Sequence, residues 1–560
     1  MIISKTIDGE NIYLSWRENG EKVQSIVPFR PYFFVEDDAY VAHYQPSKFI
    51  QRDFEYAQGQ YFSLEGKKLK KVFVENSFDV KKAKDCFART YEADVPYHFR
   101  YAVDNIGEMP EYKMRKWYWD MEWQQGGEHH DKITTIVIYD NYDERCYQWV
   151  WFPEDIQLNN RLYITDREQM IHYDESIFKF SSEKDMIENF LRTVVAKDPD
   201  MLIAWFGQRF DLPKLIERAC LVGLNPMILS PITSVKGVKK KGEGYSFAYG
   251  EKGFSPIEQP IGGRITLSLD LAFERQWNDS QRGTLPSLSL EYVSQLLFKE
   301  GKVKESKFSD KNEFFRRAWL EDTDVYLEYA RVDVDLIRRI DEENFCSEAI
   351  LSLQRLLKAP FDACFYASHM GSIYFMRNAS WKAPTGDRNV ERKDYDGAMI
   401  YDPLSENTNG LHLNVAAFDF AGLYPSMMIA RNISWETKSS EPTEFGVNIL
   451  TPRDFSESTR EQMLYYKTDT LGLLPRAVLE LKELRNDYKR LMKEARLNGN
   501  DSDFVKWNNN QMAVKRLMAS FYGIVAYQGF GWADVDLAAS ITASAREAIR
   551  LAAFKAKEME

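Results

Sequence analysis

The period of the hydrophobic positions changes several times along the first 342 residues. Short apolar runs bounded by turn residues, such as "PYFFV" and "KVFV", occupy residues 1–112 and predict a small α/β domain. From residue 113 onward strand-like runs alternate with helix-like runs, as in "KWYWDMEW", "TTIVIYD" and "DMIENFLRTVVA". This alternation predicts a mixed α/β sheet domain over residues 113–342, which closes with the long helix "TDVYLEYARVDVDLIRRIDEEN".

Helical periodicity dominates the rest of the chain. A helical stretch over residues 343–390 leads to "LHLNVAAFDFAGLYPSM", in which "LHLNVAA" predicts a strand that enters a turn. Two helices are predicted at 476–497 and 503–527, with "LNGNDSD" between them. A last helix covers "LAASITASAREAIRLAAFKAKEME". The whole pattern predicts an α/β multidomain protein.

Composition narrows the class of protein. The 560 residues are 44% hydrophobic, which indicates packed domains, and roughly two to four domains are expected from the length. The sequence has no apolar run of the roughly 18–20 residues that span a membrane, and its N-terminus has no signal-peptide pattern. Five scattered cysteines and seven histidines without ligand spacing predict a zinc-free protein of the cytoplasm, or of the host cytoplasm if viral. The net charge of −12 does not exclude a nucleic-acid partner, because a basic groove can coexist with an acidic exterior.

Acidic side chains recur at three places in the predicted sheet domain. Asp120 and Glu122 in "WDMEW" point to one face of a strand, and Asp211 follows a buried strand. Tyr329 and Asp333 are four residues apart and share one face of the long helix. Such a set could hold two hard divalent ions, Mg²⁺ or Mn²⁺, which activate water and stabilise a leaving oxygen. Each piece taken alone is more often part of a solvated surface.

The order of these elements resembles the DEDDy 3′–5′ exonuclease domain, which is ribonuclease H-like. The resemblance implies that the four carboxylates bind the metal ions, that Tyr329 orients the attacking water and that Phe210 contacts DNA. Where that family usually has Asn in its second motif, this chain has Phe206, which predicts slower editing. Asp270 in "LSLDLAF" also looks site-facing, although a structural role is equally favoured.

Another acidic position, Asp419, lies between Phe418 and Phe420. A charge among apolar neighbours is costly unless it is paired or binds a metal, so a buried metal ligand is expected here. The stretch "DFAGLYPSM" resembles motif A of family B DNA polymerases, D-x-x-x-L-Y-P-S. The resemblance implies that Asp419 binds both metal ions of a polymerase site and that the Phe420 carbonyl binds one. Leu423 and Tyr424 would line the dNTP site, with Tyr424 beneath the incoming sugar, where it rejects a 2′-hydroxyl.

Basic residues follow one face of the first helix after residue 475; they are Lys482, Arg485, Lys489, Lys493 and Arg496. A solvated face is the alternative interpretation, since acidic residues share this helix. In the next helix, "VKRLMASFYG" resembles motif B, K-x-x-x-N-S-x-Y-G, with Ala519 in place of the Asn, which puts fidelity in doubt. The resemblance implies that Arg485 and Lys489 bind the γ- and β-phosphates of a dNTP. Lys515 would neutralise the α- and β-phosphates, and Tyr522 and Gly523 would pack against the nascent base pair.

Upstream, "YDGAM" resembles the Y-x-G-G/A element that partitions primer strands between synthesis and editing, which implies DNA contacts at Tyr395 and Gly397. Together the motifs resemble an archaeal or phage-type family B polymerase over essentially the whole chain, with a right-hand architecture that lacks a thumb. The implied parts are an N-terminal domain (1–112), an exonuclease domain (113–342), a helical return to the N-terminal domain (343–390), a palm with motif A (391–475), two-helix fingers (476–528) and an incomplete palm segment (529–560).

The second palm carboxylate of the family, in a D-T-D hairpin, has no counterpart here, because Asp534 and Asp536 come too early. Two explanations stay open: a split polymerase that ends between motifs B and C, or a shortened piece of a longer chain. In the split form, which is favoured, a second subunit carries motif C and the thumb. The last helix would then pack on that subunit through Leu537, Ile541, Ala545, Ala548 and Ala552.

The predicted function is that of the large subunit of a DNA-directed DNA polymerase with a 3′–5′ proofreading exonuclease. Its expected partners are primer–template DNA, dNTPs and the second subunit, with a sliding clamp as an optional further partner. A stand-alone exonuclease with an inactive polymerase half and a non-catalytic DNA-binding scaffold are the alternatives. The stand-alone exonuclease is disfavoured because the polymerase positions are intact; they are Asp419, Tyr424, Arg485, Lys489 and Lys515. The scaffold is disfavoured because the exonuclease set is complete; it consists of Asp120, Glu122, Asp211, Tyr329 and Asp333.

Overall fold

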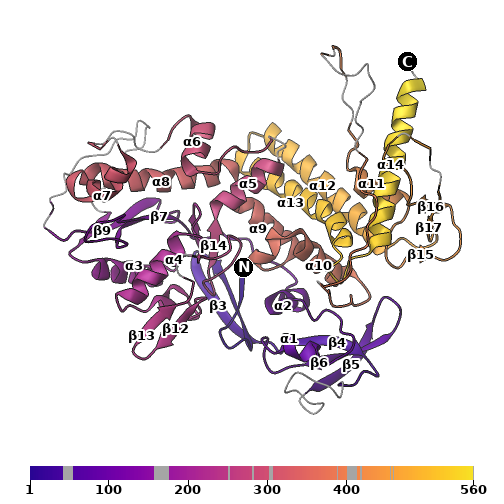
Figure 1. Cartoon of the computed structure of the whole chain (residues 1–560), viewed down its shortest axis with the longest axis horizontal. Coiled ribbons are helices and arrows are strands. Elements are labelled where there is room, and N and C mark those ends of the chain that lie inside the picture. The colour runs from indigo at the N-terminus through magenta and orange to yellow at the C-terminus, as the bar shows by residue number, and fades with distance from the viewer. Residues whose placement is uncertain are drawn as a thin grey trace. The chain divides into compact units, whose positions relative to one another are not determined.

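Figure 1 shows the helices and strands of the computed structural model. Its internal contacts divide the chain into two compact units. Unit 1 comprises Met1–Phe29, Gly107–Leu351 and Pro360–Asp362, and unit 2 comprises Arg30–Ile106, Ser352–Ala359 and Ala363–Glu560. The structure describes all residues except 42–53, 155, 157–175, 250–251, 280–282, 302–306, 309, 388, 400–410, 412, 416–418, 455, 458–459 and 559–560.

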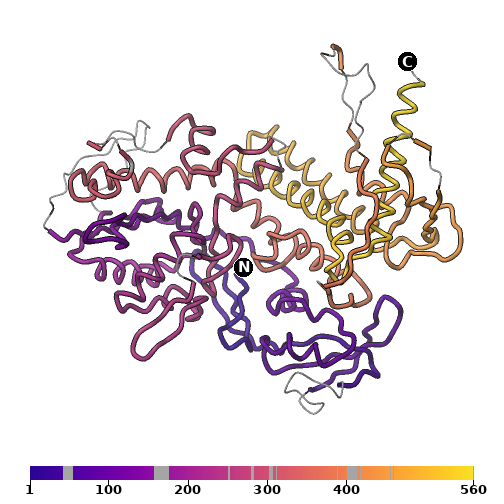
Figure 2. The backbone as a smooth tube through the Cα atoms, viewed as in Figure 1, coloured from indigo at the N-terminus to yellow at the C-terminus, as the bar shows by residue number. Residues whose placement is uncertain are grey.

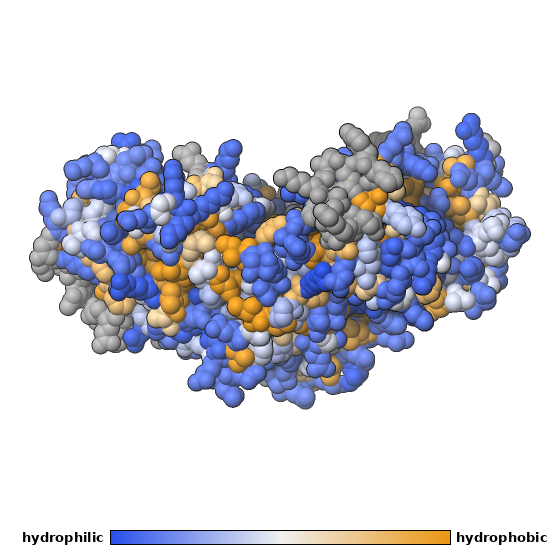
Figure 3. All heavy atoms as spheres, turned by 90° about the horizontal axis from the view of Figure 1, so that it is seen from below, coloured by the Kyte–Doolittle hydropathy of each residue, from blue (hydrophilic) through white to orange (hydrophobic). Residues whose placement is uncertain are grey.

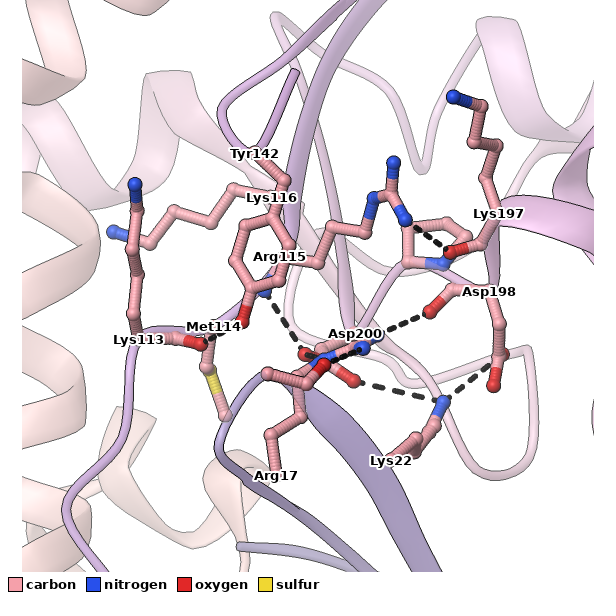
Figure 4. A network of polar contacts seen from close by, with 12 residues as sticks. Arg17, Lys22, Lys113, Met114, Arg115, Lys116, Tyr142, Lys197, Asp198 and Asp200 are labelled. Atoms are coloured by element: carbon pink, nitrogen blue, oxygen red, sulfur yellow. Dashed lines mark hydrogen bonds and ion pairs between the residues drawn. The ribbon is translucent and has the colours of Figure 1, made fainter. Parts of the chain in front are cut away.

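Unit 1 begins with a small antiparallel sheet of β1 (Ile2–Lys5), β2 (Asn11–Glu18) and β3 (Glu21–Pro28), in that order. Figure 4 shows how side chains of this sheet reach the segment before β11. The guanidinium of Arg17 donates to Asp200 Oδ2 at 2.5 Å and to the Asp198 carbonyl at 2.6 Å, and Lys22 Nζ lies 3.0 Å from Asp198 Oδ1. Asp200 is fully buried, so its charge depends on these cations.

The centre of unit 1 is a six-stranded sheet with the order β10-β9-β8-β7-β11-β14. Its strands are β7 (Lys116–Trp123), β8 (Ile133–Asp140), β9 (Arg145–Trp151), β10 (Ile177–Phe180), β11 (Met201–Ala204) and β14 (Ile265–Ser268). The middle strand β7 pairs antiparallel with β8 and parallel with β11. Trp117, Trp119 and Met121 of β7 belong to the apolar core, which leaves the alternate side chains for the opposite face.

Helices surround this sheet in unit 1. They are α3 (Glu183–Lys197), α4 (Asp211–Leu221), α5 (Leu269–Asp279), α6 (Leu290–Phe298), α7 (Lys311–Glu321) and α8 (Thr323–Asn344), with a short 3-10 helix η2 (Pro226–Leu229) and the hairpin β12 (Val238–Lys241) and β13 (Gly244–Phe247). Ser182 caps α3 by accepting from the Asp185 backbone, and α8 packs against both β7 and β8. The predicted alternation of strands and helices and the long closing helix are confirmed.

The N-terminal part of unit 2 is a sheet with the order β4-β6-β5, formed by β4 (Tyr32–Glu36), β5 (Glu55–Phe62) and β6 (Lys68–Phe73). Helices α1 (Val80–Lys84) and α2 (Tyr97–Asn105) follow it. The chain enters unit 2 again through the second half of α9 (Cys346–Leu357), the end of the 3-10 helix η4 (Phe361–Phe365) and α10 (Ala367–Asn378). Arg377 of α10 donates to the Ala102 carbonyl of α2 at 2.6 Å, so these two distant segments are joined.

The C-terminal part of unit 2 contains α11 (Leu423–Ala430) and a sheet with the order β15-β17-β16, formed by β15 (Lys438–Ser439), β16 (Phe445–Asn448) and β17 (Met463–Tyr466). The long helices α12 (Leu473–Leu497) and α13 (Asp501–Ala526) pack along each other, and α14 (Val535–Glu558) follows (Figure 2). The two predicted helices and the last helix are therefore confirmed, with bounds that differ by a few residues.

Two expectations for this part of the chain are wrong. The described residues of "LHLNVAA" form no strand, and Leu411, Leu413 and Val415 are 91%, 79% and 73% exposed. Asp419 is exposed instead of buried, because the described residues of the β15-β17-β16 sheet include no strand that pairs with this segment and covers it.

The expected packing surface of the last helix also differs from the prediction. Leu537, Ile541 and Ala545 are buried inside this chain, where α14 contacts α11, α13 and β16. Only the last turns of α14 are exposed, with Leu551 and Phe554 as their large apolar side chains.

Hydrophilic residues make up most of the face drawn in Figure 3, with apolar side chains gathered in smaller patches between them. Among the described residues, none of the helices is both long and apolar enough to cross a membrane.

Candidate active sites

The open face of β7 carries two acidic side chains. Asp120 and Glu122 are half-buried and alternate with the core residues Trp119 and Met121. Asp333 of α8, which packs on this strand, completes the group. One carboxylate oxygen from each of the three residues lies within 4.8 Å of the others.

The helix α8 brings a row of side chains to this group. Tyr326, Tyr329 and Asp333 are spaced at i, i+3 and i+7 and are all buried. The Tyr326 hydroxyl lies 2.7 Å from Thr134 Oγ1, which donates to the Glu122 carbonyl at 3.0 Å. Burial raises the pKa of Tyr326, and the neighbouring charges of Glu122 and Asp120 raise it further. Sequence reasoning missed Tyr326, although its place three residues before Tyr329 was a signal for it.

The predicted tyrosine is packed firmly. The Tyr329 ring lies 5.4 Å from the ring of Phe314 and 5.7 Å from that of Phe315, both on α7. The side chain is buried, so its direction is set by these contacts rather than by solvent.

Three of the four predicted carboxylates are thus brought together. The fourth, Asp211, is the first residue of α4 and is buried, but it is not part of the group defined by the 4.8 Å separation. Three carboxylates this close repel one another unless a cation lies among them, and carboxylate oxygens are the ligands that Mg²⁺ and Mn²⁺ prefer. The donor set therefore fits a divalent cation.

The turn before α4 exposes an aromatic side chain beside Asp211. Phe210 is 54% exposed, and its ring lies 6.2 Å from that of Phe206. Asp270 is buried at the start of α5, where burial raises its pKa, and it is not part of the group defined by the 4.8 Å separation.

In unit 2, three predicted tyrosines meet. Gly422, in the left-handed region with φ 74°, precedes α11, and Tyr424 in the first turn of α11 has its ring 4.7 Å from that of Tyr522 on α13. The Tyr522 hydroxyl lies 3.0 Å from the Tyr395 hydroxyl. Leu423 adjoins this cluster in sequence, whereas Asp419 and Phe420 lie on the exposed segment that precedes α11.

The paired helices α12 and α13 gather positive charge. The nearby charge of Arg485 lowers the pKa of Lys489, and burial, Lys493 and Lys515 lower it further, which indicates that these four cations lie close together. Arg485 Nε donates to Gln511 Oε1 at 3.2 Å across the helix pair. On α13, Lys515, Ala519 and Gly523 are exposed and follow one another every four residues, so they share one face.

Arg546 of α14 forms hydrogen bonds to the backbone of the segment that contains Tyr395 and Gly397. The buried guanidinium donates to the carbonyls of Asp396 at 2.7 Å and Gly397 at 2.6 Å. It also donates to the carbonyls of Thr451 at 2.8 Å and Ile449 at 3.1 Å. One side chain therefore ties α14 to two loops.

Asp534 and Asp536 both form ion pairs with a lysine. Lys438 Nζ lies 2.7 Å from Asp534 Oδ2 and 2.9 Å from Asp536 Oδ2. Their charges are compensated by this lysine, so they form an ion-pair cluster instead of a second metal site with Asp419.

Comparison with known proteins gives two family matches. Residues 107–259 match the exonuclease domain of DNA polymerase family B, and residues 349–559 match DNA polymerase family B itself. The chain is 27% identical to a DNA polymerase of Pyrococcus glycovorans over 99% of its own length and 67% of the relative. It is also 27% identical to the DNA polymerases of Desulfurococcus sp. (strain Tok) and Thermococcus gorgonarius, over 82% of its length and 53% of each relative. The chain thus spans between about half and two thirds of the length of these relatives. Its exonuclease and polymerase regions place the chain in DNA polymerase family B.

Proposed function

We propose that this chain is the large, exonuclease-bearing part of a DNA polymerase that extends primers on template DNA with dNTPs and removes mismatched 3′ ends. The observation that carries the proposal is the group of Asp120, Glu122 and Asp333, built on β7 and α8. The order β9-β8-β7-β11-β14, with β7 in the middle, supports the proposal of a ribonuclease H-like, DEDDy-type exonuclease.

In the exonuclease site, Asp120, Glu122 and Asp333, joined by Asp211, would hold divalent ions, Mg²⁺ or Mn²⁺. These ions supply activation of water and stabilisation of the leaving oxygen. Tyr329, fixed by its packing against α7, orients the attacking water. Water adds to the terminal phosphorus, the bond from phosphorus to the 3′ oxygen of the preceding nucleotide breaks, and a nucleoside monophosphate leaves while the primer regains its 3′-hydroxyl.

In the polymerase site, the cations of α12 and α13 receive the triphosphate of a dNTP. Arg485 and Lys489 bind its γ- and β-phosphates, and Lys515 binds the α- and β-phosphates. Asp419 and the Phe420 carbonyl would hold the metal ions there. Tyr424, whose ring lies 4.7 Å from that of Tyr522, lies beneath the sugar and discriminates against ribonucleotides.

The palm is completed by a second subunit that carries motif C and the thumb. The alternating apolar residues Leu411, Leu413 and Val415, exposed just before motif A, support this part of the proposal, because a strand added beside them would cover them. A sliding clamp is a further partner compatible with this role. A stand-alone exonuclease is less well supported, since the phosphate-binding cations of α12 and α13 would then have no function.

A primer–template assay on the purified chain tests the proposal. With Mg²⁺ and without dNTPs, the primer is expected to shorten from its 3′ end, and the double variant Asp120→Ala, Glu122→Ala is expected to lose this digestion. Extension is expected only after a subunit with motif C is added. Metal-dependent digestion that persists in the double variant would refute the assignment of the exonuclease site.

A further inference from the structure

The turn between β11 and α4 contains an aromatic residue in an unusual backbone conformation. Phe206 has φ 58°, in the left-handed region that bulky side chains rarely occupy. A residue held in such a conformation costs free energy, and it persists only when its surroundings determine it strongly. Such outliers gather at functional sites, and this one precedes the acidic residue Asp211 by five positions.

The surroundings of Phe206 do determine it. Its carbonyl accepts from the backbone N–H of Arg209 at 2.9 Å and of Phe210 at 3.1 Å. Gln208 is held on both sides: its carbonyl accepts from the Phe254 N–H at 2.8 Å, and its side chain donates to the Thr266 carbonyl at 2.9 Å.

A neighbouring loop closes against the same turn. Gly253 has φ 59°, and a Cβ atom there would lie only 2.3 Å from the Arg209 carbonyl oxygen, so only glycine allows this close approach. The conformation of the turn is therefore restricted both by the hydrogen bonds of Gln208 and by the close approach of Gly253.

The turn between β11 and α4 carries two aromatic rings, those of Phe206 and Phe210. The Phe206 ring is half-buried and meets the largely exposed Phe210 ring nearly edge to face, at 81°. The Arg209 guanidinium lies over the Phe206 ring, 5.8 Å from its centre. The next residue is Asp211, at the start of α4. Two aromatic rings and a cation thus lie in the turn that leads directly to Asp211, one of the carboxylates of the proposed exonuclease site.

We propose that Phe206 is a second stacking platform for the bases of a single-stranded 3′ end, next to Phe210. The inference rests on the proposed exonuclease function and specifies how its substrate is recognised. Aromatic rings stack on every base, and such contacts tolerate sequence. At position 206 the related motif has an asparagine, whose amide recognises a ligand by hydrogen bonds. The Phe206 ring of this chain would instead stack on the face of a base. The site should therefore prefer an end that carries a base over an abasic end.

Binding of a single-stranded oligonucleotide with 2-aminopurine at its 3′ end, in EDTA so that nothing is cleaved, tests the proposal. Phe206→Leu keeps an apolar side chain without an aromatic face, and it should weaken binding about tenfold and reduce the fluorescence quenching. Phe206→Trp should retain both. Phe178→Leu serves as the control, because Phe178 is a partly exposed ring on β10, at the edge of the sheet beyond β8 and β9.

An oligonucleotide with an abasic 3′ end completes the design. The parent chain should bind it about as weakly as Phe206→Leu does, and the difference between the two proteins should shrink to less than twofold. Equal affinity and equal quenching of the parent and Phe206→Leu on the 2-aminopurine end would overturn the inference, as would a loss that is the same on the abasic end.

The two proposals fail in different ways. If the parent chain digests DNA and Phe206→Leu binds normally, the stacking inference falls and the exonuclease function stands. If the parent binds and quenches but never digests DNA with Mg²⁺, the exonuclease function falls while the stacking result stands. Phe206→Gly provides a check on folding, because glycine accepts the left-handed backbone: it should unfold no earlier than the parent yet bind as weakly as Phe206→Leu.

Discussion

Replacing Asp333 with asparagine is expected to stabilise the metal-free chain and to weaken its response to divalent cations. Asp333 forms two of the three close pairs within the carboxylate group, whose oxygens lie within 4.8 Å. Two unit charges at that distance repel by about 3.5 kcal/mol at an effective dielectric constant of about 20. Asp120 and Glu122 are half-buried, so solvent reduces this value, and a gain of about 1–2 kcal/mol in the free energy of unfolding is expected.

The cation response should change in the opposite sense. An ion that binds only the folded chain adds about 2.7 kcal/mol of stability at a concentration of about 100 times its Kd. Asparagine removes one of the charged ligands, so most of the shift between EDTA and Mg²⁺ or Mn²⁺ should disappear. Urea unfolding of the full chain, with and without the cation, measures both effects.

Asp341 on the same helix provides a matched control. It is buried like Asp333, but its carboxylate accepts from the Tyr118 hydroxyl at 2.8 Å, the Ser347 N–H at 2.7 Å and the Ser347 hydroxyl at 2.6 Å. Asp341→Asn should therefore lose about 1.5–3 kcal/mol of stability and keep the full cation shift. If Asp333→Asn behaves like this control, Asp333 is a structural carboxylate and the metal-site reasoning is refuted.

Two further predictions concern unit 2. Arg546→Ala leaves four carbonyls of two loops without their donor and should lower the free energy of unfolding by about 2–4 kcal/mol, with partial recovery in Arg546→Lys; an unchanged urea midpoint would contradict this. Burial works against the charge of Lys438, but Asp534 and Asp536 raise its pKa above the ordinary value. Its stabilising contribution is therefore complete below about pH 10.4 and is lost as the pH rises through the higher folded pKa. Lys438→Met should lower stability at pH 7 and flatten the alkaline part of the stability profile, and a parent-like alkaline profile would contradict the ion pair.

Features that repeat along the chain could be predicted from the sequence. The alternation in "KWYWDMEW" placed Asp120 and Glu122 on one face of β7, and the spacing of Tyr329 and Asp333 placed them on one side of α8. The long periodic runs became α12, α13 and α14. Local periodicity is sufficient in these cases, because the geometry of a single helix or strand determines which of its side chains share a face.

Features that depend on distant segments could not be predicted. Whether Asp419 is buried depends on neighbouring strands, which no local pattern reveals. Lys438 meets Asp534 across almost a hundred residues. The left-handed Phe206 lies in a turn whose residues Gln208 and Arg209 contact the distant Thr266 and Gly253. The predicted division at residue 112 remains a prediction; by contacts, residues 1–29 group with the exonuclease sheet.

The interleaving of the two units has a consequence for how the protein is made and how it can be recombined. Residues 30–106 emerge from the ribosome long before residues 363–560, with which they share a unit, so unit 2 is complete only after this later segment has been made. The exonuclease sheet, in turn, needs the first segment of the chain, since Arg17 and Lys22 neutralise the buried Asp200. A chimera that exchanges the exonuclease domain between relatives would have to include residues 1–29 together with the sheet. Otherwise the buried Asp200 would lose the cations that neutralise it.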